Sequence, residues 1–328
     1  MADVARLAGV SSQTVSRVAN GLTNVDDSTR QRVREAMAAL DYRPNSAARA
    51  LRTGRSKSIG VIMFTLSSFG NRKTLDAVAT AAADSDYSIT LIPILHPSQQ
   101  AVTDAFIRLG AQAVDGVVIV IEAHVLDRSE IVLPAGLPVV IIDSDAGKHY
   151  TVVDTDQTEG ARLATQHLID LGHAQVWHIS GPTSSYSAAR RTESWRTTLR
   201  AAGIEPPQVL VGDWTTESGY EHGLTLSAQP EVTAIFAAND QMALGVLRAL
   251  HESGRQVPSS VSVVGFDDTE ESSSYWPPLT TIQQDFDEVG RLCIQKLLEE
   301  IKDGRATKGT TIVPTKLVVR SSTARPAG

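Results

Sequence analysis

The sequence predicts an α/β core of two parallel-sheet subdomains, preceded by a small all-α domain. Residues 3–42 show helical patterns only. From Ile59 onward, short apolar strand candidates alternate with amphipathic helices, which is typical of parallel sheets covered on both faces. This alternating part is roughly 260 residues long, too long for one ordinary sheet, so we expect two similar halves with a cleft between them.

The first domain is predicted to contain a helix-turn-helix. The expected helices are Asp3–Ala8, Ser12–Asn20 with Ser11 as its N-cap, and a third that Asp27 or Ser28 caps and that ends at Leu40. Gly9 and Val10 make the turn between the first two helices, which gives the packing unit of a helix-turn-helix. A plain three-helix bundle with a polar surface is the alternative.

Polar side chains and charge both favour a DNA-binding role for this first domain. Ser12, Gln13, Ser16 and Arg17 project from the second helix. Arg can donate two hydrogen bonds to a guanine edge, and Gln can pair with adenine. Residues 1–57 carry ten Lys/Arg against five Asp/Glu, whereas the rest carries twenty against thirty-two. The net charge of −7 alone argues against nucleic acid, but a basic module on an acidic body does not.

A polar linker is predicted to join the two parts. Residues 43–58 are rich in Ala and Arg and end with Thr53-Gly54-Arg55-Ser56 before the first strand. Because this composition is too polar for a core, we expect an exposed linker that holds one short helix, Ala47–Leu51.

The core is predicted from apolar strand candidates and the helices between them. The strand candidates are Ile59–Phe64, Ile89–Leu95, Gly116–Ile121, Val139–Ile142, Val176–Ser180, Ala234–Ala238 and Val261–Phe266. The helical runs include Thr158–Leu171, Gln241–Ser253 and Asp285–Lys302. Ligands of such sheets bind at the carboxyl ends of the strands, so a ligand site is expected in the loops after Ile142, Ser180, Ala238 and Phe266.

Five side chains in or near these loops suit a sugar ligand. Sugar hydroxyls both donate and accept hydrogen bonds, so planar groups that make paired bonds hold them well. Such groups come from Asp143, Arg191, Asn239 and Asp267, and Trp214 offers an aromatic face to a pyranose ring. Plainer alternatives remain: Trp214 packs in the core, Asp267 belongs to a solvated acidic loop, or Arg191 forms a surface ion pair beside Arg190.

Signals for catalysis, metal binding and membrane insertion are absent from the sequence. It has no G-x-S-x-G, G-x-G-x-x-G or P-loop motif, and no Cys or carboxylate cluster accompanies His173 and His178. Cys293 is the single cysteine, predicted to be a core or half-exposed residue without a disulfide. No apolar run reaches the ~18 residues of a membrane helix, and no apolar signal region is present. These features predict a cytoplasmic protein that is not an enzyme and needs no cofactor or metal.

Motifs along nearly the whole chain resemble the lactose-repressor family of bacterial regulators. In the first domain and linker they are Asp3-Val4-Ala5, Ala8-Gly9-Val10-Ser11, Thr14-Val15-Ser16-Arg17-Val18, Asn20-Gly21, Thr29-Arg30, Tyr42-x-Pro44-Asn45 and Ala48-Arg49-x-Leu51. In the core they are Gly181-Pro182, Ser184-Ser185, Gly212-Asp213-Trp214, Ala238-Asn239-Asp240-Gln241-Met242, Val263-Val264-Gly265, Asp267-Asp268-Thr269-Glu270 and Pro277-Pro278-Leu279-Thr280-Thr281-Ile282. The resemblance implies a sequence-specific DNA-binding transcription regulator with a periplasmic-binding-protein-like core.

The resemblance also implies which residues contact DNA. Ser12, Gln13 and Arg17 match base-reading positions, with Ser16 on the same helix, and Asn20 and Asn24 match backbone- or base-contact positions. The segment from Ala47 and Ala48 to Leu51 matches a hinge helix that enters the minor groove, where Leu51 wedges between base pairs. An ordinary apolar linker residue is the alternative for Leu51. One departure is that the family usually has a few residues before Asp3, including a capping Thr. Either the start is truncated here, or Asp3 or solvent caps the first helix.

In the core, the resemblance implies a set of effector-binding residues. The matching positions are Asp143, Ser187, Arg191, Trp214, Asn239, Asp267, Gln284 and Phe286. They imply a repressor of sugar-utilisation genes that a sugar effector, here a galactoside, releases from operator DNA. The alternatives are a non-sugar effector such as a purine, a sugar-binding receptor without a DNA role, and a cytoplasmic enzyme that acts on a sugar.

The resemblance and the patterns together predict the domain boundaries and the assembly. The expected parts are a headpiece over residues 1–44, a hinge and linker over 45–57, an N-subdomain over 58–155 and 286–313, and a C-subdomain over 156–285 and 314–328. The residues after Arg320 contain no leucine heptad, so we expect a homodimer through the core rather than a tetramer.

Overall fold

The computed structural model describes residues 1–19, 21, 23–42, 54–94, 98–120, 136–144 and 150–326. The chain divides into two compact units, Met1–Ser56 and Lys57–Gly328, and each is described by itself. The predicted hinge helix, with Ala47, Ala48 and Leu51, lies outside the described residues, as does Asn20.

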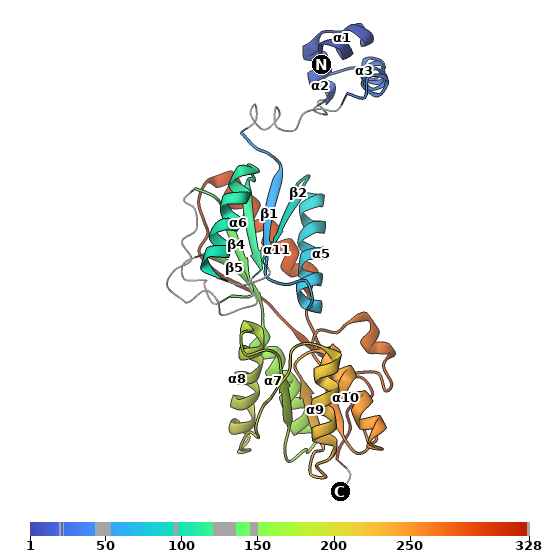
Figure 1. The fold of residues 1–328 in the computed structure, drawn as a ribbon, viewed down its shortest axis with the longest axis vertical. Helices are drawn as coiled ribbons and strands as arrows, with labels where there is room; N and C mark the ends of the chain where they lie inside the picture. Colours follow the sequence, from blue (N-terminus) through green and yellow to red (C-terminus); the bar gives the residue numbers. More distant parts are fainter. Residues whose placement is uncertain are drawn as a thin grey trace. The chain divides into compact units, whose positions relative to one another are not determined.

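The described part of the first unit contains three helices, α1 (Ala2–Ala8), α2 (Ser12–Ala19) and α3 (Asp27–Ala39) (Figure 1). They enclose a small core in which Val4, Val15 and Val33 are almost completely buried. Gly9 ends α1 with a φ of 65°, a left-handed conformation that glycine adopts without strain. No side chain caps the start of α1, in line with the predicted choice between Asp3 and solvent.

The cap of α3 corrects one expectation. Asp26, rather than Asp27 or Ser28, is the N-cap: its Oδ1 accepts hydrogen bonds from the Thr29 backbone N–H at 2.9 Å and from Ser28 Oγ at 2.7 Å. These bonds favour the ionised carboxylate and lower the pKa of Asp26 to about 2.

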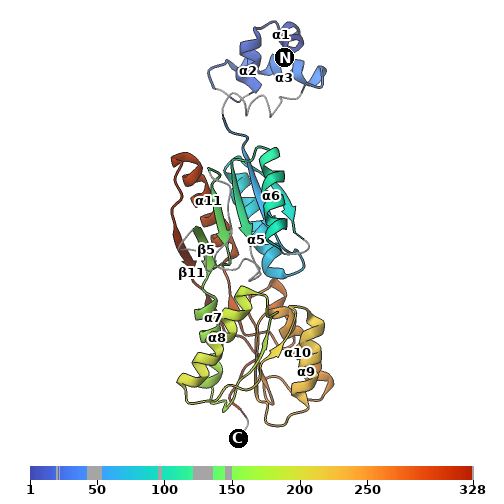
Figure 2. The ribbon, with the colours of Figure 1, turned by 60° about the vertical axis from the view of Figure 1, so that its left-hand side comes forward.

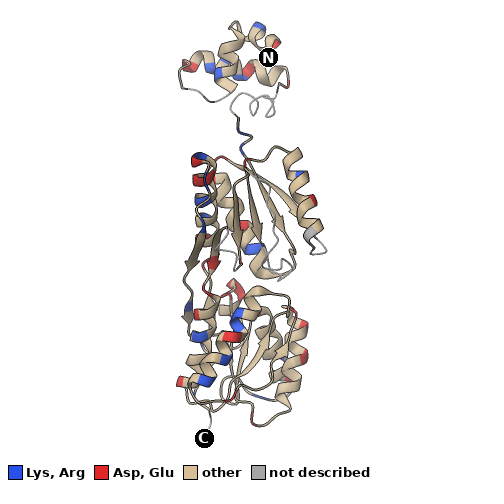
Figure 3. Ribbon diagram, turned by 90° about the vertical axis from the view of Figure 1, so that its left-hand side faces the viewer, with Lys and Arg blue, Asp and Glu red and all other residues tan. Residues whose placement is uncertain are grey.

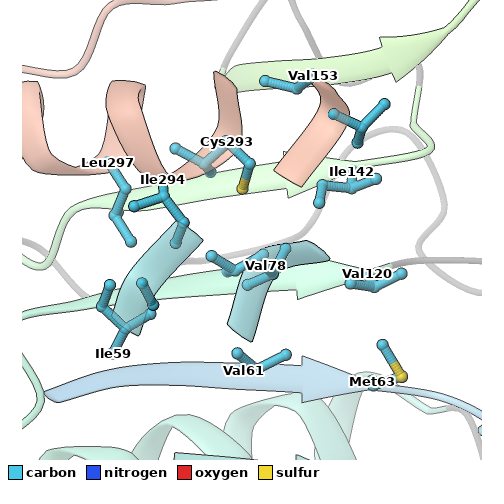
Figure 4. Packing of buried hydrophobic residues seen from close by; sticks show 14 of the residues in the cluster. Ile59, Val61, Met63, Val78, Val120, Ile142, Val153, Cys293, Ile294 and Leu297 are labelled. Carbon is cyan, nitrogen blue, oxygen red and sulfur yellow. The ribbon is translucent and has the colours of Figure 1, made fainter. Parts of the chain in front are cut away.

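The second unit begins with a six-stranded parallel sheet in the order β11-β5-β4-β3-β1-β2. The strands are β1 (Ser58–Met63), β2 (Ser88–Pro93), β3 (Gly116–Val120), β4 (Val139–Ile142), β5 (Thr151–Thr155) and β11 (Gly309–Val313). One face packs on α5 (Phe69–Asp84) and α11 (Phe286–Asp303), and Figure 4 shows Val78, Cys293 and Leu297 meeting the strands there. The other face packs on α6 (Gln99–Ala111). We call this part the N-subdomain.

The C-subdomain is built around a four-stranded parallel sheet in the order β7-β6-β8-β9. Its strands are β6 (Trp177–Ser180), β7 (Leu210–Val211), β8 (Ala234–Ala237) and β9 (Ser262–Val264). One face is covered by α7 (Gln157–Asp170) and α8 (Tyr186–Ala201), the other by α9 (Thr216–Ser227) and α10 (Asp240–Glu252) (Figure 2). A 3-10 helix, η2 (Glu270–Ser274), and an antiparallel pair, β10 (Thr281–Gln283) with β12 (Lys316–Val318), complete it.

The α/β architecture agrees with the predicted fold class. All seven strand candidates form strands: β2, β3, β6 and β8 are one residue shorter than expected, and β9 is three residues shorter. The three helical runs form α7, α10 and α11. The predicted subdomain boundaries fall where the chain passes from β5 to α7, from β10 to α11 and from β11 to β12; they remain a prediction. Among the described residues, no helix is both long and apolar enough to cross a membrane.

Candidate functional site

The helix α2 has one buried and one polar face. Val15 and Val18 are buried against the other two helices, while Ser12 and Gln13 are exposed and Ser16 and Arg17 are half-buried. The four predicted DNA-contacting residues of this helix therefore remain accessible from outside the headpiece core. Asn24 is exposed in the loop before α3.

The eight predicted effector residues line a single pocket in the core. Asp143 and Phe286 come from the N-subdomain, and the other six come from the C-subdomain or from the segment that links the two. Residues that were not predicted also line it: Ser68, Phe69, Gly70, Asn71, Thr74, Val120, Ile142, Asp154, Thr155, Gln157 and Val289. The pocket thus lies between the carboxyl ends of the two parallel sheets, where the topology placed it.

Arg191 is the central cation of this pocket. It is 4% exposed, whereas its neighbour Arg190 is exposed, so the surface ion pair considered for Arg191 is wrong. Its Nε donates to Oε1 of Gln157 at 2.8 Å, and Nη1 donates to the carbonyl oxygen of Ala238. The guanidinium lies over the Phe266 ring, 3.7 Å from its centroid. These contacts hold the arginine in one orientation before any ligand arrives.

Asp267 belongs to the same network. Its Oδ1 lies 3.8 Å from Nη1 of Arg191 and accepts a hydrogen bond from Nε2 of Gln284 at 2.7 Å. Nε2 of Gln157 donates to Oε1 of Gln284 at 3.2 Å, which closes a ring of four buried side chains. Asp267 is 5% exposed, so it is not part of a solvated acidic loop.

Asn239 connects the network to Trp214. Asn239 caps α10, because its Oδ1 accepts the Met242 backbone N–H at 2.8 Å. Its Nδ2 donates to the carbonyl oxygen of Trp214 at 3.0 Å. The Trp214 ring packs beside Gly181 so closely that a Cβ on that glycine would lie 2.2 Å from the ring. Trp214 therefore both packs on the C-subdomain core and lines the pocket.

Backbone strain is concentrated in this pocket. Asp143, Trp214 and Asp267 have φ values of 61°, 73° and 113°, in the region that non-glycine residues rarely adopt. Such conformations persist where the surroundings fix them, and they cluster at ligand sites.

Asp154 is a pocket residue that the sequence reasoning missed. It lies in β5 and is 3% exposed. Figure 3 shows the charged residues of the core mainly on helices and loops, and among the described strands only β5 and β12 contain one. Burial raises the pKa of Asp154 to about 7, although Arg190 and Arg191 favour its charged form. Because β5 was not among the predicted strands, the sequence held no local signal for Asp154.

Asp240, the first residue of α10, stands directly behind the pocket. It accepts hydrogen bonds from the Thr269 backbone N–H at 2.9 Å, from Thr281 Oγ1 at 2.6 Å and from Ser272 Oγ. Burial raises the pKa of Asp240 to about 6 against the effect of these donors. The carboxylate thus fixes the segment that carries Asp267.

The two histidines considered for a metal are structural. His178 is fully buried between the Phe236 carbonyl oxygen and Thr192 Oγ1, and burial lowers its pKa to about 3. His173 contacts Thr233 and Ser262 instead. Within the described ranges, no group of three His, Cys, Asp or Glu residues has the arrangement of a metal site. Cys293 is buried in the N-subdomain core, and burial raises the pKa of its thiol.

Comparison with known proteins gives matches to both units. Residues 1–45 match bacterial regulatory proteins of the lacI family, and residues 165–323 match the periplasmic binding protein-like domain. The chain is 38% identical over 328 residues to the lactose operon repressor of Escherichia coli (strain K12). The matched region covers 99% of this chain and 90% of that protein. It is 34% identical to the HTH-type transcriptional repressor PurR of Haemophilus influenzae (strain PittEE), over 98% of this chain and 97% of that one.

Solved structures show the same likeness. The lac repressor dimer bound to operator and the anti-inducer ONPF superimposes with a TM-score of 0.87 at 37% identity, covering 98% of both chains. The complex of the transcriptional regulator CelR with cellobiose superimposes with a TM-score of 0.73 at 31% identity, again over 98% of both.

Proposed function

Because this chain belongs to the lacI family of bacterial regulatory proteins, and is therefore a DNA-binding transcriptional repressor and not an enzyme, we propose that it controls sugar-utilisation genes. It acts in the cytoplasm as a homodimer on operator DNA and releases that DNA when a galactoside binds in the core pocket. The observation that carries the effector assignment is the ring of Arg191, Gln157, Gln284 and Asp267 beside Trp214, joined by three hydrogen bonds and one ion pair.

The pocket suits a sugar because it offers fixed donors and acceptors next to an aromatic face. Arg191 can donate to one hydroxyl while Asp267 accepts from its neighbour, and such charge-assisted bonds are stronger than neutral ones. Trp214 covers an apolar ring face. The likeness to a CelR–cellobiose complex supports a glycoside, and the higher identity to lactose operon repressor supports a galactoside.

A non-sugar effector is the second candidate. Arg191 and Asp267 can also hold a planar ring that carries nitrogen donors and acceptors, and relatives named PurR are 34% identical to this chain. Thermal unfolding separates the two candidates, since a ligand that binds only the native state raises the melting temperature.

Titration calorimetry with paired galactosides and glucosides tests the sugar. A hydroxyl of opposite configuration leaves a buried polar group unpaired, at about 1–3 kcal/mol, so glucosides should bind measurably worse. Equal or tighter binding of glucosides contradicts the galactoside, and binding of a purine alone supports the second candidate. Neither result affects the assignment to the family.

The headpiece is proposed to read DNA through α2. Arg17→Ala should cost about 1–3 kcal/mol and relax base preference at one position of each half-site, as measured by mobility shifts on a randomised library. Binding should also weaken steeply with salt as counterions are released. For the hinge, Leu51→Ala is proposed to reduce DNA bending without changing sugar affinity. Uniform binding of all sequences by the wild-type protein contradicts specific readout.

The dimer is proposed to form through the core. Trp276, in the loop after η2, is 92% exposed, and an exposed tryptophan is typical of a protein–protein interface. Light scattering at micromolar concentration should give a dimer, and Trp276→Ala should shift it toward the monomer. A tetramer contradicts the proposed assembly.

The switch is proposed to be a two-state equilibrium. The effector contacts both subdomains, because Asp143 and Phe286 belong to one and Arg191 and Asp267 to the other. A ligand shifts such an equilibrium only by its different affinity for the two states. We propose that the liganded arrangement of the subdomains separates the two hinges of the dimer.

A further inference from the structure

Asp154 differs from Asp240 and Asp267, the buried carboxylates in or beside the pocket, in what surrounds it. It is 3% exposed and lines the effector pocket, yet no donor among the described residues bonds its Oδ1. A hydrogen bond with the backbone of Thr155 is the one that favours its ionised form. A buried polar atom without a partner costs free energy, so such an atom in a pocket points to a ligand.

Asp240 shows what a structural aspartate looks like in the same protein. It is more enclosed than Asp154, but three donors from Thr269, Ser272 and Thr281 bond its two oxygens. The pKa of Asp240 rises to about 6 and that of Asp154 to about 7. Desolvation is the largest cause for both, and at Asp240 it is opposed by hydrogen bonds from Ser272, Thr281 and Thr269.

The charges that line the pocket are unequal. Three carboxyls, Asp143, Asp154 and Asp267, stand among the described lining residues with one cation, Arg191. That cation already lies 3.8 Å from Asp267. An anionic ligand would therefore enter a pocket with an excess of negative charge, whereas a ligand with donor groups would meet acceptors.

We propose that Asp154 is a specificity residue that accepts a hydrogen bond from a donor on the effector, so the pocket takes neutral sugars and amino sugars and rejects sugar acids and sugar phosphates. This rests on the proposed function, because it assumes that the effector binds in this pocket. A hydroxyl and an ammonium group supply the same donor chemistry at Asp154, and the ammonium group gains an ion pair in addition.

The experiment measures calorimetric affinities of the full-length protein for a series of methyl galactosides. In each, one hydroxyl is replaced by hydrogen or by an amine, and galacturonate is the anionic probe. When the hydroxyl that faces Asp154 is replaced by hydrogen, the affinity of wild type should be roughly 10- to 100-fold lower than for the parent galactoside. The reason is that this change removes a hydrogen bond to a charged group. The amino sugar should bind at least as well as the parent, and galacturonate should not bind.

The variant Asp154→Asn should remove this pattern. The amide carries no charge, so the preference for the amine should disappear and galacturonate should gain affinity. The matched control is Glu300→Gln: Glu300 is also buried, with an Oε2 that no described donor bonds, but it does not line this pocket. Glu300→Gln should change none of the affinity ratios, which separates charge selection from a general effect of burying a carboxylate.

A measurement on wild type alone guards against a variant that does not fold. The ratio of the affinities for amino and parent sugar should fall as the pH is lowered below about 7, because the amine is already largely protonated there while Asp154 takes up a proton. The charged groups near Asp154 are Asp156 at the start of α7, Arg190 and Arg191 on α8, and the pocket carboxyls Asp143 and Asp267. Equal ratios in wild type and Asp154→Asn, or a ratio that does not change with pH, overturn this proposal alone. If no galactoside of the series binds wild type, the galactoside assignment falls and this proposal falls with it.

Discussion

The two walls of the effector pocket are built on different principles. The wall from the C-subdomain is a largely bonded network: Arg191, Gln157, Gln284 and Asp267 are joined by hydrogen bonds and one ion pair, and Asn239 holds the backbone of Trp214, whose indole Nε1 has no partner among the described residues. The wall from the N-subdomain contains Asp154, whose Oδ1 has no donor in the described part of the chain, and the aromatic pair Phe69 and Phe286 with centroids 6.0 Å apart.

The two walls therefore have different effects on ligand binding: one pre-organises the pocket, and the other selects the ligand. A wall whose groups are already bonded keeps its shape without ligand, and it contributes affinity because little is left to order. A wall with an unsatisfied carboxyl gains most from a ligand that supplies the missing donor. We therefore expect substitutions in the C-subdomain wall to lower both stability and ligand affinity. Asp154→Asn, in contrast, should remove ligand selection without lowering stability.

The largest effect is expected from Arg191→Ala. It leaves Asp267 buried without its cation and removes the donors to Gln157 Oε1 and to the Ala238 carbonyl oxygen, at about 3–5 kcal/mol of unfolding free energy. Sugar response should be lost, while operator binding should persist because the headpiece is a separate unit. Chemical denaturation and mobility shifts measure the two effects. An Arg191→Ala protein that still responds to sugar would remove the arginine from the effector site.

The next effect is the pH dependence that Asp154 gives to stability. The carboxyl titrates near 3.8 in the unfolded chain and near 7 in the native protein. Between these two pH values only the native state keeps the proton, so the unfolding free energy of wild type falls as the pH rises toward 7. Above pH 7 the full cost of burying the ionised carboxylate remains. Asp154→Asn should therefore be more stable than wild type by on the order of 3 kcal/mol at pH 8, and by little at pH 4.

Urea unfolding of both proteins across this pH range measures that difference. A gap between Asp154→Asn and wild type that is constant from pH 4 to pH 8 would show that Asp154 is ionised throughout. The gap should close when a saturating amino sugar is added, because a ligand donor then replaces the missing one.

The sequence predicted the C-subdomain wall better than the N-subdomain wall for a physical reason. In the first wall, Asn239 and Asp267 follow apolar strands that were predicted, and the carboxyl ends of parallel strands converge on one edge. Gln284 came from the family resemblance, and Gln157 was not predicted. Asp154 lies within its strand, Thr151–Thr155, and this strand contains too few apolar residues for its sequence to be distinguished from a loop. The strands β7, β9, β10 and β12 are two or three residues long, and of these only β9 was predicted, within a longer apolar run.

Contacts between distant residues were also beyond the sequence. Gln157 and Gln284 are 127 positions apart, and nothing in either local pattern indicates that they bond each other. The cap of α3 shows the same limit at short range: Asp26, Asp27 and Ser28 can each accept a capping hydrogen bond, and the backbone conformation selects Asp26.

A third prediction tests whether the C-subdomain wall depends on shape as well as bonds. Gly181→Ala places a Cβ 2.2 Å from the Trp214 ring, so the ring must move, at about 1–3 kcal/mol of stability. Sugar affinity should fall while binding of operator remains. Gly110→Ala is the matched control, because no atom lies within 4 Å of the added Cβ on α6. Calorimetry that finds the same sugar affinity in both variants would show that Trp214 does not shape the ligand site.

The smallest effect is expected at the start of α8, the helix that carries Ser187 and Arg191. Ser185 caps this helix, because its Oγ accepts the Ala188 backbone N–H at 3.3 Å, and it also lies 3.1 Å from Oγ of Ser187. Ser185→Ala should cost about 1 kcal/mol of stability, the usual value of an N-cap. Because the first turn of α8 forms part of the pocket, sugar affinity should fall as well.

Ser98→Ala provides the comparison for Ser185→Ala. Ser98 caps α6 in the same way, through the Ala101 backbone N–H at 3.2 Å, but it does not line the pocket. The two variants should lose similar stability in thermal unfolding, and only Ser185→Ala should lose sugar affinity. Equal affinity in both would mean that the network around Arg191 holds α8 in position without its cap, so that the pre-organisation of this wall resides in its side chains rather than in the helix start.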